Sequence, residues 1–118
     1  MLVKDENSSI NFIDENDNFV GFRSYQCCCE DFGWSIKTSG DEDISIVEND
    51  PTFLKGFVFN TSMQPIELAV SGYEDGGTVS FQLVNNDTGE SLCLELYNHH
   101  NGYYSHGWDT SFGHSGYL

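Results

Sequence analysis

Basic side chains are scarce in this sequence. Its 118 residues include only 4 Lys and Arg against 19 Asp and Glu, so the formal net charge is −15. Nucleic-acid binding needs Lys and Arg to neutralise phosphates, so a direct nucleic-acid ligand is excluded. The same charge opposes adhesion to anionic membranes. No apolar run approaches the roughly 20 residues that cross a bilayer, so we expect no membrane-spanning segment.

The sequence also shows no secretory signal at its start and no cysteine spacing that is typical of a disulfide framework. The chain turns acidic at once with Asp5 and Glu6, which argues against a signal peptide and favours the cytoplasm. Three of the four cysteines are consecutive, at positions 27–29, and the fourth is Cys93. Neighbouring residues of a strand point to opposite faces, so three consecutive cysteines cannot serve one site. We therefore expect reduced thiols, as is usual in the cytoplasm.

Helical periodicity is absent as well. No long window has apolar residues at the spacing of an amphipathic helix. One helix start is indicated, with Asp50 as the cap, Pro51 in the first position and Gly56 as the end, which leaves room for about one turn near residues 51–55. The length fits a single domain, residues 1–118.

Period-two alternation, typical of strands, takes the place of helices. It is clearest at residues 78–84 and 91–97, which the turn-forming stretch Asn85–Glu90 joins into a predicted antiparallel hairpin. Further strand signals occur at 10–13, 19–29, 32–36, 44–46, 57–59, 66–70 and 103–108. The sequence predicts a mainly β domain, an antiparallel sheet or small sandwich with at most one short helix, and an α+β fold is the alternative.

Two short stretches resemble a known group of proteins. Tyr25–Glu30 reads aromatic-x-Cys-Cys-Cys-Glu, and Asn101–His106 reads Asn-Gly-Tyr-Tyr-Ser-His. Together they resemble a family of uncharacterised small phage and bacterial domains, and the resemblance would cover most of the chain. It brings no established activity, so it implies no catalytic residue. It does imply a phage origin and a role directed at the host.

Cysteines and histidines raise the possibility of a structural zinc site. Cys27 and Cys29 would share one face of a strand, and thiolate and imidazole are ligands that zinc prefers. The remaining candidates are His99, His100 and His106. The usual Cys-x2-Cys spacing is missing, however, so thiols packed in the core and hydrogen-bonded histidines are the simpler reading. Zinc is the one cofactor the sequence suggests, and otherwise we expect none.

Two other chemistries fit the residues poorly. The run from Asp14 to Asn18 has oxygens at the first positions of a calcium loop, but Phe19 stands where that loop needs glycine. A solvated acidic turn is therefore favoured. Cysteine, histidine and aspartate are the inventory of a thiol hydrolase, yet no local signature surrounds any cysteine. We expect no enzymatic activity.

The acidic excess favours a protein partner. Solubility of a small domain needs only about 2–8 units of net charge, whereas this chain carries −15. We predict a non-catalytic, phage-type inhibitor that presents carboxylates to a basic surface of a host protein and so mimics nucleic acid, for example in an anti-CRISPR or other anti-defence role. The alternative is a small zinc-binding domain. The predicted contact residues are Asp14, Glu15, Asp17, Asp41, Glu42, Asp43, Glu48, Asp50, Tyr103, Tyr104 and Trp108. Aromatic residues such as Tyr103, Tyr104 and Trp108 are more often core or edge-strand residues, and their rings would also suit stacking on a sugar.

Overall fold

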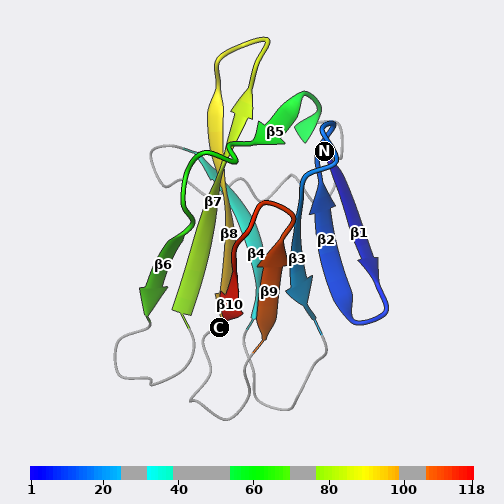
Figure 1. Cartoon of the computed structure of the whole chain (residues 1–118), viewed down its shortest axis with the longest axis vertical. Coiled ribbons are helices and arrows are strands. Elements are labelled where there is room, and N and C mark those ends of the chain that lie inside the picture. Colours follow the sequence, from blue (N-terminus) through cyan, green and yellow to red (C-terminus); the bar gives the residue numbers. More distant parts are fainter. Residues whose placement is uncertain (25–31, 39–53, 70–76, 99–105) are drawn as a thin grey trace.

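Two antiparallel sheets make up the computed structural model of the chain (Figure 1). It describes residues 1–24, 32–38, 54–69, 77–98 and 106–118. The first sheet has the strand order β1 (Leu2–Glu6), β2 (Ser9–Ile13), β3 (Phe19–Arg23), β9 (Gly107–Thr110) and β10 (Ser115–Tyr117). The second runs β4 (Phe32–Thr38), β8 (Ser91–Asn98), β7 (Gly77–Asn85) and β5 (Phe57–Phe59), while β6 (Ile66–Ala69) pairs with the first part of β7.

The mainly β prediction is confirmed. Within the described ranges there is no helix, and accordingly none long and apolar enough to cross a membrane. The short helix expected near 51–55 and the strand expected at 44–46 lie largely or wholly outside the described residues.

The predicted central hairpin is present with the expected faces. Phe81 lies opposite Leu94, and every second residue of both strands is buried. The turn between them is fixed by the side chain of Asn85, whose Oδ1 accepts the backbone N–H groups of Asp87 and Thr88. Gly89 has a φ of 77°, which glycine adopts at little cost. Both strands therefore form the centre of the second sheet.

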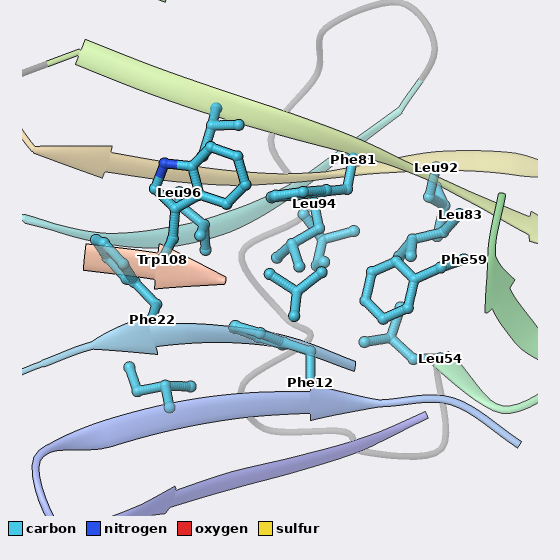
Figure 2. Packing of buried hydrophobic residues seen from close by; sticks show 14 of the residues in the cluster. Phe12, Phe22, Leu54, Phe59, Phe81, Leu83, Leu92, Leu94, Leu96 and Trp108 are labelled. Carbon is cyan, nitrogen blue, oxygen red and sulfur yellow. The ribbon is translucent and has the colours of Figure 1, made fainter. Parts of the chain in front are cut away.

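The core lies between the two sheets (Figure 2). Phe12 and Phe22 from the first sheet are fully buried, as are Leu94 and Leu96 from the second. Aromatic rings link the sheets edge to face, with a centroid distance of 5.1 Å between Phe12 and Trp34 and 5.5 Å between Phe81 and Trp108. Such pairs add to the free energy that apolar burial already contributes.

Strand β1 was not predicted. Its partner β2 buries Ile10 and Phe12, whereas every residue of β1 is exposed. A two-residue turn joins the strands, with φ values of 54° at Asn7 and 60° at Ser8, as in the tight turns that suit the twist of a hairpin. Backbone pairing, rather than burial of its side chains, holds β1 in place.

The β9–β10 hairpin replaces the strand expected at 103–108. Of that range, residues 103–105 lie outside the described part, and the strand itself spans Gly107–Thr110. Trp108 points into the core and lies against Gly116 of β10, where an added Cβ would come within 2.9 Å of the indole ring.

We expect Gly116→Ala to lower the free energy of unfolding by about 1–3 kcal/mol, the usual range for overpacking. The indole is buried and packs edge to face on Phe81, so it must shift from this contact to admit the added methyl group. Gly107→Ala is the matched control, because its Cβ would meet only ordinary contacts at 3.5–3.7 Å. Urea unfolding of both variants tests this prediction. If the two variants had equal free energies of unfolding, Trp108 would not be packed tightly against Gly116 in the β9–β10 hairpin.

Candidate functional site

Asp14 is buried and serves the fold. Its side chain is 4% exposed; Oδ1 accepts the N–H groups of Asn16 and Asn18 at 2.9 Å, and Oδ2 accepts that of Phe59 at 2.9 Å. The predicted role of Asp14 in presenting a carboxylate is therefore wrong. Oδ1 instead closes the β2–β3 turn, and Oδ2 ties that turn to β5.

Glu15 and Asp17 stand on that turn and are exposed, as predicted for contact residues. The turn is tied to the second sheet, because Asp14 is bonded to Phe59 of β5, and Phe59 pairs with Leu83 of β7. Beyond Leu83, the tip of the central hairpin carries two more exposed carboxylates, Asp87 and Glu90. We call these four residues, Glu15, Asp17, Asp87 and Glu90, the acidic end; in Figure 1 the tip of the hairpin is uppermost, and the β2–β3 turn lies lower, near the N-terminus.

Basic side chains do not neutralise the acidic end. No ion pair joins its four carboxylates to another described residue. Lys55 is exposed just before β5. Elsewhere Lys37 is paired with Glu95 at 3.1 Å, and Arg23 is 3.8 Å from Asp109. The negative charge of this end therefore faces solvent.

The most acidic segment of the sequence begins and ends beside the acidic end. Thr38, before it, pairs with Leu92 at the top of β8, and Gly56, just after it, lies against the side chain of Asn85. Between them, residues 39–53 lie outside the described part and hold five acidic residues and no basic one. These are the predicted contact residues Asp41, Glu42, Asp43, Glu48 and Asp50.

Trp108 is a core residue. It is 3% exposed and packs edge to face on Phe81, so its predicted place on a contact surface is wrong. The other two predicted aromatics, Tyr103 and Tyr104, lie outside the described residues.

His106, a predicted zinc ligand, is also buried. Its ring stacks on Phe32 with a centroid distance of 4.1 Å, and Nδ1 lies 2.8 Å from the carbonyl oxygen of Arg23. The other candidates, Cys27, Cys29, His99 and His100, are outside the described ranges. Across the described ranges, no three His, Cys, Asp or Glu side chains gather as metal ligands would.

Cys93 lies on the outer face of the central hairpin. Burial raises the pKa of its thiol, while a hydrogen bond with Ser80 acts in the opposite direction. A raised pKa keeps the thiol protonated at neutral pH, and the thiolate is the nucleophilic form. Cys93 is therefore poorly suited to act as a nucleophile.

Sequence reasoning missed a group of polar residues around β10, namely Arg23, Glu67, Asp109, His114, Ser115 and Tyr117. They line two hollows on either side of that strand. They come from β3, β6 and the β9–β10 hairpin, so no local spacing connects them. The nearest signal was the unusual tail, rich in histidine and aromatic residues and poor in aliphatic ones.

Comparison with known proteins adds no relative. No protein-family model, curated protein or solved structure matches the chain. Function must therefore be argued from the acidic end and the other features of the chain itself.

Proposed function

We propose that this protein is a non-catalytic interaction protein whose acidic end docks on a basic surface of a nucleic-acid-binding host protein in the cytoplasm. The observation that supports this is the convergence of charge. Four exposed carboxylates without basic partners stand where both flanks of the acidic segment 39–53 also lie. An anti-defence role, such as inhibition of a CRISPR effector, is the narrower form that the two phage-like motifs imply.

Rigid placement makes these carboxylates suited to imitate phosphates. The turn of Glu15 and Asp17 is fixed by the three hydrogen bonds of Asp14, and the turn of Asp87 and Glu90 by those of Asn85. Charges held in place before binding lose little conformational entropy on association. They also repel one another in the free protein, and a basic partner relieves that repulsion.

Capture from a bacterial lysate, with the wild type and two double variants as bait, tests the proposal. Asp87→Asn/Glu90→Gln removes two charges from the acidic end, and Asp5→Asn/Glu6→Gln removes two from exposed β1. We expect the wild type and the β1 variant to retain the same nucleic-acid-binding protein, released by salt, since exposed charges are screened within about 10 Å. The acidic-end variant should retain much less of it.

Equal capture by the two double variants would mean that net charge, and not the acidic end, governs binding. Capture that is indifferent to salt would exclude a charge-led interface. Either result contradicts the proposal, provided that all three proteins melt at the same temperature.

A further inference from the structure

The indole nitrogen of Trp108 is a buried polar atom without a hydrogen-bond partner in the described core. Trp108 is 3% exposed, yet its only polar side-chain atom, Nε1, donates no hydrogen bond in the part of the chain that the structure describes. In Figure 2 this nitrogen lies on the side of the ring away from Phe81. Buried N–H donors in folded proteins are nearly always paired with protein or with ordered water, so this edge of the indole is an unusual feature of the core.

A polar hollow of about 350 Å³ adjoins this indole. Glu67 of β6 and Gln64 before it form one wall, His114 and Ser115 of the β9–β10 hairpin form the other, and Trp108 lines it as well. The hollow opens between the edge strands of the two sheets, β6 and β10. Its walls offer a carboxylate acceptor, an amide, an imidazole and a hydroxyl.

A second hollow, of about 590 Å³, lies on the other side of β10. Arg23 and Asp109 supply charged groups, and the ring of Tyr117, which is 80% exposed, stands beside them. Gly107 leaves the space between Tyr117 and Arg23 open, since a Cβ there would meet the ring at 3.5 Å and the arginine stem at 3.7 Å. An exposed ring beside a donor and an acceptor gives an apolar platform with a polar rim.

The two hollows adjoin each other, because Ser115 of β10 and Trp108 of β9 line both. A ligand longer than one ring could therefore cross β10 and occupy both. We name this pair of hollows the β10 site.

We propose that the β10 site binds a neutral saccharide. A sugar hydroxyl donates one hydrogen bond and accepts others, so it matches walls in which Glu67 and Asp109 accept while Arg23 donates. The C–H face of a sugar ring fits the exposed ring of Tyr117. An anion would be repelled by the two carboxylates and by a net charge of −15, and a cation would be repelled by Arg23.

Titration of the full chain with cellohexaose, maltohexaose and chitohexaose, followed by nuclear magnetic resonance, tests this proposal. Only Trp34 and Trp108 give indole N–H signals, and Trp34→Phe assigns them. We expect at least one oligosaccharide to shift the Trp108 signal in a saturable manner. Tyr117→Ala and Glu67→Gln should each weaken that binding about tenfold, the effect of losing one good contact.

Matched controls are available at other exposed positions. Leu68→Ala removes an exposed apolar side chain from β6, and Glu90→Gln removes a carboxylate from the acidic end, so neither should change saccharide affinity. Absence of binding by all three oligosaccharides would overturn the proposal. So would binding that Tyr117→Ala and Glu67→Gln leave intact, or a Trp108 shift caused by uncharged adenosine alone. None of these results bears on the acidic end.

Discussion

Leu94→Asp is expected to leave the protein unfolded at room temperature. Leu94 is fully buried and lies between Ile36 of β4 and Phe81 of β7. The change forfeits about 1.5–3 kcal/mol of apolar burial and places a carboxylate in the core, which adds several kcal/mol more. Together these approach the total stability of a small domain, about 5–15 kcal/mol. Circular dichroism and thermal melting report the loss directly.

Leu68→Asp is the matched control for that experiment. It makes the same chemical change on β6, where the side chain is 62% exposed, and we expect melting close to that of the wild type. If the two variants melt alike, the central hairpin does not have the faces described here.

Asp14→Asn should destabilise the fold by about 2–4 kcal/mol, because hydrogen bonds to a charged acceptor contribute about 1.5–3 kcal/mol each. The asparagine side chain keeps one oxygen, which can still accept the N–H groups of Asn16 and Asn18. Its NH₂ group replaces Oδ2 and so sets a donor against the N–H of Phe59. Denaturant unfolding measures the loss. Asp17→Asn is the control: Asp17 is exposed, and its φ of 63° suits asparagine, so stability should change by less than about 0.5 kcal/mol.

A stability of Asp14→Asn equal to that of Asp17→Asn would show that Asp14 is one more solvated carboxylate. The turn that carries Glu15 and Asp17 would then lose its anchor to β5. The comparison thus tests a structural link on which the proposed interface depends.

Strands were predictable where one face is buried without interruption. The central hairpin alternates cleanly along both strands, and a strong turn signal lies between them, so its register followed from the sequence. The alternation of Ile66 and Leu68 likewise predicted β6, but not its exposure, because an edge strand leaves its outer side chains uncovered. Strand β1 gave no signal, since it buries nothing.

The roles of individual site residues were less predictable, because each role depends on contacts with residues that are distant in the sequence. Asp14, Glu15 and Asp17 look alike in an acidic run, and only the N–H of Phe59, far along the chain, distinguishes Asp14 from the others. His106 and Trp108 stand in a polar tail, yet that tail returns to the first sheet as β9 and buries both. The β10 site required three separate segments to be brought together.

Competition for the captured partner tests the central claim most directly. Labelled nucleic acid is bound to that partner, and the protein is titrated in. We expect the wild type and Asp5→Asn/Glu6→Gln to displace the nucleic acid equally, whereas about tenfold more of Asp87→Asn/Glu90→Gln should be needed, because loss of complementary charge slows encounter. If the partner binds nucleic acid and this protein together, or if both double variants compete alike, the acidic end is not a nucleic-acid mimic.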